Sequence, residues 1–321
     1  MKKSLIALAV FGATAGATHA QSSVSLYGRL DLSLMHNHFF GGASQFTVDS
    51  GTISGSRWGL IGSEELGGGL KVNVNLEQDI AADKGAAPAG LAFSRQAWLG
   101  MSGAFGEFRV GKPWTAYDDV SGAHNAMFDS GFSVENNFFA STGYAANPPD
   151  SIRYSTPTFG GFSAAVSYSL DEVKNADFSV KSISGQYGGG PLQFGAGYQV
   201  EEQGGTSIKF TRLSGSYDFG AFVLKGLYGH VKLPVAGKTN EYSIGVDVPV
   251  SDALTVSAGL GHSRDTAAAG GTRRQGFTVG ALYAISKRTE LYAGLTDWDG
   301  KAAGVKTDGN TKYGLGVRHA F

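Results

Sequence analysis

Cysteine is absent from the 321 residues of this chain, which excludes disulfides, metal–thiolate sites and cysteine nucleophiles. Beyond the first twenty residues there is also no apolar run of about 18 or more, so no membrane-spanning helix is expected. Nor is there a basic excess. Without Lys2 and Lys3, the 26 basic residues fall to 24 against 27 acidic ones, a net charge of −3. This balance provides no basic surface for nucleic acid.

The first twenty residues have the layout of a secretory signal peptide. Two lysines near the start are followed by an apolar run over 5–11 and by small residues ending at Ala20. We therefore expect residues 1–20 to be removed on export. Residues 21–321 then form one domain, because no linker or change of composition divides them.

Short segments that alternate apolar and polar residues fill most of this domain. In 24–34, Val24 and the leucines lie on one face, while Arg29 and Asp31 lie on the other. A period of two is typical of a strand with one apolar and one polar face. About sixteen such strands are predicted, an even number that suits a bacterial barrel. They are 24–35, 53–62, 69–80, 92–102, 106–113, 151–157, 160–171, 178–188, 191–201, 206–219, 221–232, 240–250, 253–264, 274–286, 289–299 and 311–321.

The connections between these strands alternate in length. The tight ones are 102–106, 158–161, 188–191, 219–221 and 286–289; the longer ones are 36–51, 81–91, 114–149, 265–272 and 299–310. Short periplasmic turns opposite longer external loops are typical of a transmembrane barrel. A soluble β-solenoid or β-sandwich would also give many strands, but without this alternation and without tyrosines at the strand ends.

The longest connection, 114–149, is the third on the long-loop side. A structureless loop of this length is uncommon in a compact domain and is usually functional or disordered. It combines aromatic residues that can pack with acids that need water or partners. We expect it to fold back into the barrel and to narrow it.

Alternation also predicts which charged residues enter the lumen. Apolar neighbours, Trp98 among them, are expected to face lipid, which turns Arg57, Arg95, Arg109 and Arg153 inward. The acids expected to oppose them are Glu77 and Asp79 from the wall and Asp118, Asp119, Asp129 and Glu135 from the loop. Opposed charges would produce a transverse field that selects and orients solutes. For each residue the alternative is a solvated side chain without a role, and which loop acid faces the arginines stays open.

Six stretches resemble a known family. They are SSVSLYGRLDLSL, SRWGLIGSEELGGGLKVNVNLEQD at 56–79, FSRQAWLGMSGAFGEFRVGKPWTAYDD at 93–119, DSIRYSTPTFGGFSAAVSYSL at 150–170, AISKRTELYAGL at 284–295 and KYGLGVRHAF at 312–321. Together they resemble the Gram-negative general porin family, in its beta-proteobacterial branch. Residues 171–282 match by pattern more than by motif.

This resemblance implies an all-β, 16-stranded antiparallel transmembrane β-barrel that assembles as a homotrimer in the outer membrane, with its third loop inside the lumen. Ions and small hydrophilic solutes would cross it passively. The terminal Phe321 resembles the signal read by the outer-membrane barrel insertion machinery. Arg57, Arg95 and Arg153 lie at the positions in these motifs that correspond to the basic residues of the family's constriction. For Arg109, only the alternation along its strand supports an inward direction.

No cofactor and no metal site is expected. His36 and His38 form an H-x-H pair without an identifiable third ligand. A substrate-specific anion channel of the same fold is one alternative function, and phosphate, sulfate or a dicarboxylate would suit the arginines. An outer-membrane barrel hydrolase is a second, although the scattered histidines have no nucleophile motif near them. We expect anion preference, because at about 0.15 M salt charges act over only about 8 Å, which favours the local arginines over distant acids.

Overall fold

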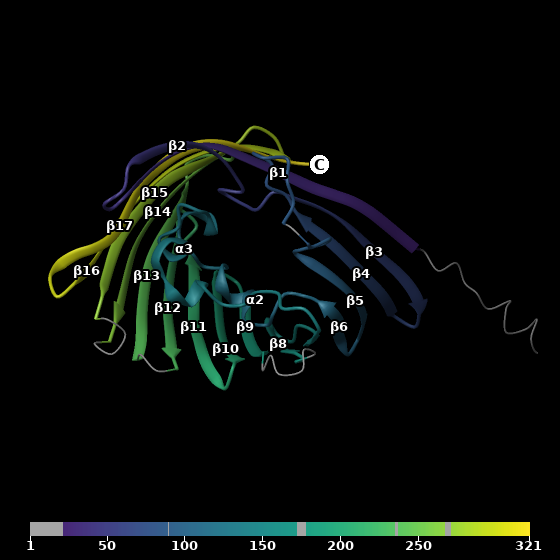
Figure 1. Ribbon diagram of the computed structural model, residues 1–321. Helices are drawn as coiled ribbons and strands as arrows, with labels where there is room; N and C mark the ends of the chain where they lie inside the picture. Colours follow the sequence, from purple (N-terminus) through teal and green to yellow (C-terminus); the bar gives the residue numbers. More distant parts are fainter. Residues whose placement is uncertain (1–21, 89, 172–177, 235–236, 267–270) are drawn as a thin grey trace, which may run out of the picture.

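The computed structural model describes residues 22–88, 90–171, 178–234, 237–266 and 271–321, so the signal peptide expected at 1–20 lies outside the described residues. The described chain forms one antiparallel barrel whose strands follow one another around the wall (Figure 1). No helix within these residues is long and apolar enough to cross a membrane.

The wall contains 17 strand segments joined into one sheet, which closes where β1 pairs with β17. Their bounds are β1 Ser22–Phe39, β2 Ser44–Ser50, β3 Arg57–Gly67, β4 Leu70–Asp79, β5 Gln96–Gly103, β6 Gly106–Lys112, β7 Ser151–Ser155, β8 Phe162–Ser169, β9 Ser179–Gly189, β10 Leu192–Gln203, β11 Thr206–Asp218, β12 Val223–Leu233, β13 Gly237–Pro249, β14 Leu254–Asp265, β15 Arg273–Ala284, β16 Thr289–Ala302 and β17 Val305–Ala320. Four short helices lie between β6 and β7: α2 Asp118–Ser121, η1 Met127–Asp129, α3 Val134–Phe138 and η2 Ala140–Thr142.

Two of these segments share one position in the wall. β2 pairs with residues 32–38 of β1, and β3 pairs with residues 22–29 of the same strand. Counted as one interrupted strand, they reduce the 17 segments to 16. The predicted 16-stranded antiparallel barrel is therefore confirmed.

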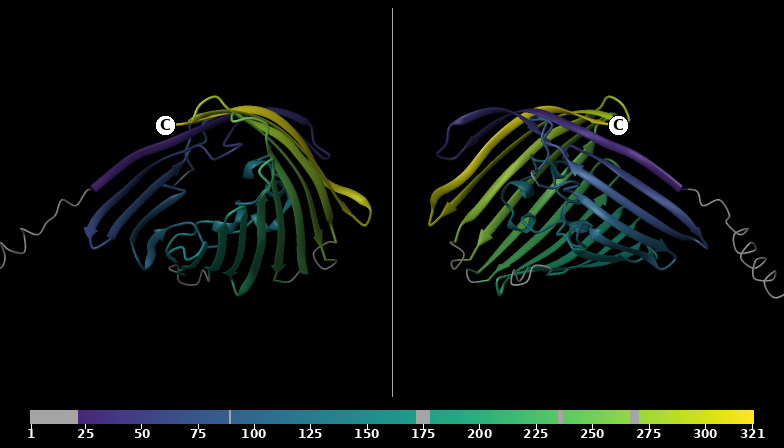
Figure 2. Two further views of the ribbon diagram at one scale, coloured as in Figure 1. Left: turned by 180° about the vertical axis from the view of Figure 1, so that it is seen from behind. Right: turned by 45° about the vertical axis from the view of Figure 1, so that its right-hand side comes forward.

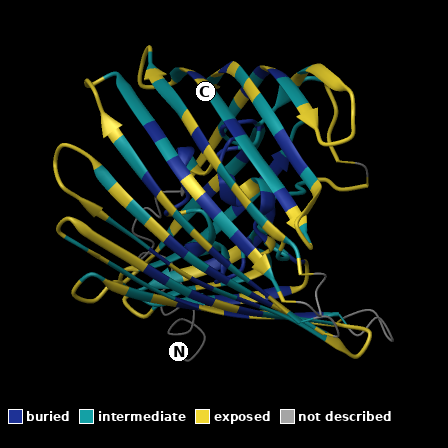
Figure 3. Ribbon diagram, turned by 90° about the vertical axis from the view of Figure 1, so that its left-hand side faces the viewer, coloured by how far each residue is buried: buried dark blue, intermediate teal, exposed yellow. Residues whose placement is uncertain are grey.

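The alternating sequence pattern is the physical basis of this wall. In β1, Leu26 and Leu34 are 63% and 61% exposed on the outside, whereas Asp31 is fully buried inside. Buried and exposed bands accordingly alternate along the strands (Figure 3). A membrane barrel reverses the usual arrangement because its outer face meets lipid and its inner face meets water or folded loop.

Two of the predicted long loops are wrong. Residues 36–51 are mostly strand: β1 continues to Phe39, a turn follows, and β2 returns from Ser44. Residues 299–310 form a hairpin between β16 and β17, with a turn at Ala303 and Gly304, both at positive φ. Polar, glycine-rich sequence resembles loop sequence, but here it continues the strands of the wall.

The C-terminal residue of the chain pairs with the N-terminal strand β1. The backbone N–H of Phe321 donates to the Gly28 carbonyl at 3.0 Å, and the Gly28 N–H donates to the Phe321 carbonyl at 3.1 Å. The Phe321 ring lies against Gly28, where a Cβ would be 2.4 Å from the ring. Only glycine gives this ring its place on the outer surface.

Candidate functional site

The long third connection, residues 113–150, folds into the barrel and is here called L3. Figures 1 and 2 show its helices inside the wall, on the side of β8 to β16. Serine hydroxyls of the wall accept hydrogen bonds from the backbone of L3. The Ala116 N–H donates to Ser182 Oγ at 2.9 Å, and the Met127 N–H donates to Ser257 Oγ at 3.0 Å. L3 therefore lies against the inner face of the wall.

Inward-facing glycines allow L3 to lie directly on the wall. A Cβ at Gly294 would be 2.6 Å from the Phe132 ring, and one at Gly259 would be 2.3 Å from Ala126 Cβ. These glycines were not predicted to be functional among the 49 glycines of the chain. Glycine at a strand position whose alternation points inward is the signal that would have identified them, because glycine in a strand marks the close approach of another backbone.

Two of the four predicted loop acids anchor L3 rather than face water. Glu135 is fully buried, and it accepts from Ser243 Oγ at 2.5 Å and from the Ala126 N–H at 3.3 Å. Both Asp119 oxygens accept from Arg153 Nη2, at 2.7 and 2.6 Å. Asp119 therefore faces one of the predicted arginines, whereas the expectation that Glu135 opposes them is wrong.

The other two loop acids remain accessible from the lumen. Asp129 is exposed, and Asn125 and Asn136 donate to it at 2.7 and 3.0 Å. Asp118 is half-buried and accepts from the Tyr144 hydroxyl at 2.6 Å. Burial raises the pKa of Asp118 to about 6, against the lowering effect of the Tyr144 hydrogen bond, and the charges of Asp119 and Asp129 raise it further.

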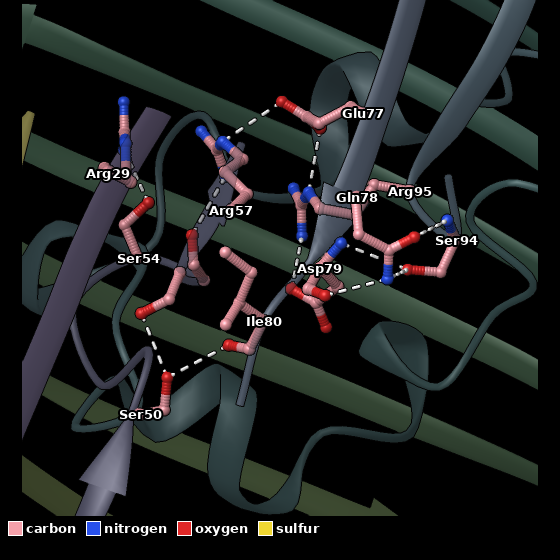
Figure 4. Close-up of polar contacts among 12 residues, drawn as sticks. Arg29, Ser50, Ser54, Arg57, Glu77, Gln78, Asp79, Ile80, Ser94 and Arg95 are labelled. Atoms are coloured by element: carbon pink, nitrogen blue, oxygen red, sulfur yellow. Dashed lines mark hydrogen bonds and ion pairs between the residues drawn. The ribbon is translucent and has the colours of Figure 1, made fainter. Parts of the chain in front are cut away.

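A group of charges lies on the wall formed by β1, β3 and β4 and the start of β5 (Figure 4). Glu77 lies between two arginines: Arg57 Nε is 3.1 Å from one of its oxygens and Arg95 Nε is 2.8 Å from the other. Asp79 is 3.8 Å from Arg95 Nη1. The prediction that Glu77 and Asp79 oppose the arginines across the lumen is wrong, since both lie among them.

Arg29 belongs to the same group and was missed as a candidate. Its Nη1 donates to Ser54 Oγ at 2.6 Å, beside Arg57 (Figure 4). Its position on the polar face of 24–34 was the available signal. We call Arg29, Arg57, Arg95, Glu77 and Asp79 the basic wall cluster; its three guanidiniums exceed its two carboxylates by one positive charge.

Arg153 and Arg109 point inward, as predicted, but lie outside this cluster. Arg153 is 6% exposed, and besides Asp119 it donates to the Trp114 and Thr115 carbonyls at 3.0 and 2.9 Å. It therefore holds the start of L3. Arg109 donates to Glu107 of its own strand at 2.6 Å and lies 4.3 Å from the centre of the Trp98 ring.

The predicted orientation of Trp98 is wrong. Its ring points inward and is 7% exposed, its Nε1 donates to Gln96 Oε1 at 2.8 Å, and the next residue, Leu99, is 59% exposed on the outside. Trp suits either side because its ring is apolar and its N–H is polar. Arg95 still reaches the lumen because β5 begins only at Gln96, so strand alternation does not set its direction.

The interruption between β2 and β3 connects the cluster to L3. Buried Asp31 accepts from the Ile53 and Ser54 N–H groups, both at 2.7 Å, and from the Tyr292 hydroxyl. In the same turn, the Thr52 carbonyl accepts from the Gly131 N–H of L3 at 2.6 Å. A cavity of about 570 Å³ opens beside this turn, with Asp79 and Gly131 in its lining. One carboxylate thus fixes the turn that positions both Arg29 and the tip of L3.

Replacing Asp31 with asparagine is expected to weaken this turn. The neutral amide loses the charge that strengthens three hydrogen bonds, and hydrogen bonds to charged groups contribute roughly 1.5–3 kcal/mol each. We expect a lower thermal unfolding midpoint in detergent and larger fluctuations of the open-channel current. Tyr292→Phe, which removes one of the three donors, should show a smaller effect of the same kind. A steady current in Asp31→Asn would show that L3 does not depend on this turn.

No group of three or more residues suited to hold a metal ion occurs in the described part of the chain. His36 and His38 lie on β1, where His36 stacks on Tyr313 with ring centroids 4.7 Å apart and His38 contacts Ser44 at 3.0 Å.

Comparison with known proteins agrees with this architecture. Residues 6–303 match the family described as Gram-negative porin. The chain is 35% identical to outer membrane porin protein 32 of Delftia acidovorans and 28% identical to an outer membrane porin protein of Bordetella pertussis, over the full length of each pair. Among solved structures, the anion-selective porin from Comamonas acidovorans superimposes with a TM-score of 0.76 at 27% identity, covering 94% of this chain and 100% of that one.

Proposed function

This chain belongs to the Gram-negative porin family as an outer-membrane β-barrel porin, and from that premise we propose that its channel passes small hydrophilic solutes and favours anions. One observation carries the proposal: the basic wall cluster places three guanidiniums against two carboxylates on the lumen wall. Glu77 and Asp79 keep the arginines from repelling one another, and one positive charge is left for passing ions. A bound anion is not trapped, because the site is open to water.

L3 supplies the other side of the proposed constriction. Asp118 and Asp129 are its accessible carboxylates, so the charge across the lumen is of opposite sign to the wall cluster. An ion that passes nearer the wall meets the guanidiniums, and a polar solute aligns its dipole with the field between the two sides. Because salt screens charges beyond about 8 Å, we infer that the cluster outweighs the net charge of the whole chain.

The remaining parts of the proposal rest on the family likeness. We infer that residues 1–20 are a cleaved signal peptide, that three copies form a homotrimer, and that Phe321 is read by the barrel insertion machinery. The protein acts without a cofactor and without catalysis. Chemical cross-linking of intact outer membranes would give a trimer band, which the same treatment of heat-denatured protein would lack.

The test is the zero-current potential of purified protein in a planar bilayer under a KCl gradient. We expect open channels with a potential of the sign for chloride preference, and a smaller potential for Arg95→Ala. Solute flux should rise linearly with concentration, whereas saturation by phosphate or a dicarboxylate would favour a substrate-specific channel. Correctly folded barrels without conductance would contradict the proposal and make hydrolase assays the next step.

Acid is expected to strengthen the chloride preference. Since the pKa of Asp118 is raised to about 6, this group becomes neutral as the pH falls through that value and L3 loses a negative charge. The zero-current potential should therefore shift towards chloride with a midpoint near pH 6. Burial and the charge of Lys225 lower the pKa of His124, so this histidine contributes only at lower pH. An Asp118→Asn channel with the same midpoint would exclude Asp118 as the titrating group.

A further inference from the structure

The cavity beside the interruption between β2 and β3 carries charges that the proposed constriction does not use. Its volume of about 570 Å³ is within the range of about 300–1,000 Å³ that is typical of small-molecule pockets. Ser50, Asp79 and Ile80 of its lining lie beside the basic wall cluster in Figure 4. Residues of β1, β2 and β17 and Gly131 of L3 also line it. A solute in this cavity is therefore next to the proposed constriction.

Two opposite charges in this cavity have no partner. Asp49 on β2 and Lys312 on β17 both line the cavity, and both are half-buried. Their neighbours Val48 and Tyr313 are exposed on the outer face, so alternation turns both charges inward. Within the described part of the chain, neither charged group makes an ion pair or a hydrogen bond. The remaining charges of the lining are paired, Asp79 with Arg95 at 3.8 Å and Asp83 with Lys84 at 3.9 Å.

The strand register holds these two charges apart. Lys312 is directly opposite Asn37 of β1, and Asp49 is directly opposite Ser33 of the same strand. Four residues separate these positions on β1, which is roughly 13 Å along the strand at about 3.3 Å per residue. The ammonium and the carboxylate therefore face one space without meeting in it. We call this space the Asp49–Lys312 cavity.

A solute that carries both charges would provide a partner for each group. A lone anion at Lys312 would leave Asp49 unpaired, and a lone cation at Asp49 would leave Lys312 unpaired. A charge that is partly removed from water is unfavourable without a partner. Among the described residues that line the cavity none is aromatic, so no ring is present on which a planar solute could stack. The lining therefore favours a small solute with a positive and a negative end.

We propose that the Asp49–Lys312 cavity binds zwitterionic solutes, of which α-amino acids are the simplest class. The solute carboxylate accepts from the Lys312 ammonium, and the solute ammonium donates to the Asp49 carboxylate. An α-amino acid has no net charge near neutral pH, so the positive charge of the basic wall cluster does not favour or exclude it. The inference rests on the proposed function, because solutes reach the cavity through the open lumen.

The test measures binding of L-alanine to the purified protein in detergent by saturation-transfer difference NMR on the alanine methyl group. The signal should saturate with alanine concentration, whereas erythritol, an uncharged solute, should give no saturable signal. Asp49→Asn/Lys312→Gln removes both charges and leaves the net charge unchanged. Each partly exposed charge pair contributes about a three- to fivefold factor, so this variant should bind alanine roughly 10- to 25-fold more weakly.

Two control variants make the result specific. Glu65→Gln/Lys71→Gln removes an exposed ion pair of 2.5 Å near the β3–β4 turn, at the far end of β4 from Asp79, and also leaves the net charge unchanged. It should bind alanine as the wild type does. Lys312→Arg keeps the charge and should keep alanine binding. Wild-type binding by Asp49→Asn/Lys312→Gln would place alanine elsewhere and overturn the site.

Two further measurements complete the test. Acetate and methylammonium carry one charge each, so both should compete with alanine more weakly than glycine does. Competition by acetate as strong as that by glycine would assign the cavity to carboxylates alone and overturn the zwitterion. KCl conductance of the same preparations separates the site from the channel: conducting barrels without saturable alanine binding would overturn this inference alone, and folded barrels that bind alanine without conducting would overturn the proposed function alone.

Discussion

Replacing both Arg57 and Arg95 with glutamine is expected to turn a chloride-favouring channel into a potassium-favouring one. The two arginines hold Glu77 between them, and Arg95 is the neighbour of Asp79. Without them the wall keeps two carboxylates against Arg29 alone. In water, two unit charges about 4 Å apart have an interaction energy of about 1 kcal/mol. The loss of two positive charges should therefore lower the chloride-to-potassium permeability ratio by roughly 10- to 30-fold.

Two further variants make this experiment specific. Arg57→Lys/Arg95→Lys keeps the charges, so it should keep the chloride preference. Glu77→Gln removes the acid between the arginines and should strengthen that preference. All three are compared by zero-current potential under the same KCl gradient. If the glutamine variant keeps the wild-type potential, selectivity is controlled by L3 rather than by the basic wall cluster.

Replacing Gly294 with valine is expected to push L3 off the wall towards the lumen and to lower single-channel conductance. A Cβ at this position would lie 2.6–3.0 Å from three atoms of the Phe132 ring, which cannot be accommodated without displacing the ring. Phe132 is fully buried in a cluster with Met35, Ile53, Met127 and Tyr292, so its displacement opens the contact of L3 with the strand interruption. Overpacking of this kind costs typically about 1–3 kcal/mol.

The control for this substitution is a glycine in open space. A Cβ at Gly185 of β9 would meet nothing within 4 Å, so Gly185→Val should leave conductance unchanged. Adding Phe132→Ala to Gly294→Val makes room for the new side chain and should recover part of the thermal stability. Wild-type conductance in a correctly folded Gly294→Val barrel would show that L3 does not depend on this contact.

Alternation in sequence predicts much of the wall, because in a barrel it records directly which side chains meet lipid and which face the lumen. It placed Arg109 and Arg153 inside correctly, since Phe108, Val110 and Ile152 on the same strands are clearly apolar and exposed. It failed at Trp98, an amphipathic residue close to a strand end. It also missed β2, a seven-residue strand in which exposed Phe46 and Val48 alternate with polar neighbours.

The candidate site was predicted only in part, for a related reason. Alternation predicts on which side of the wall a side chain lies, but not how high it lies along the barrel axis. That height depends on the stagger of neighbouring strands. Arg57 and Arg95 meet at Glu77 because the register places Arg57 opposite Asp79 and Glu77 opposite Gln96. The pairing of Glu77 with two arginines and the role of Arg29 could not be derived from any one strand.

The sequence by itself determined the barrel, its number of strand positions, the identity of the internal loop and the inward direction of Arg57, Arg109 and Arg153. Each of these depends on local pattern, on strand length or on loop length. Only the tertiary structure decided which charges are free and which are anchors. Asp119 pairs with Arg153, and Glu135 reaches Ser243 on the far wall, because the path of L3 is set by close packing on glycines distant in sequence. Such long-range contacts produce no periodic pattern in the sequence.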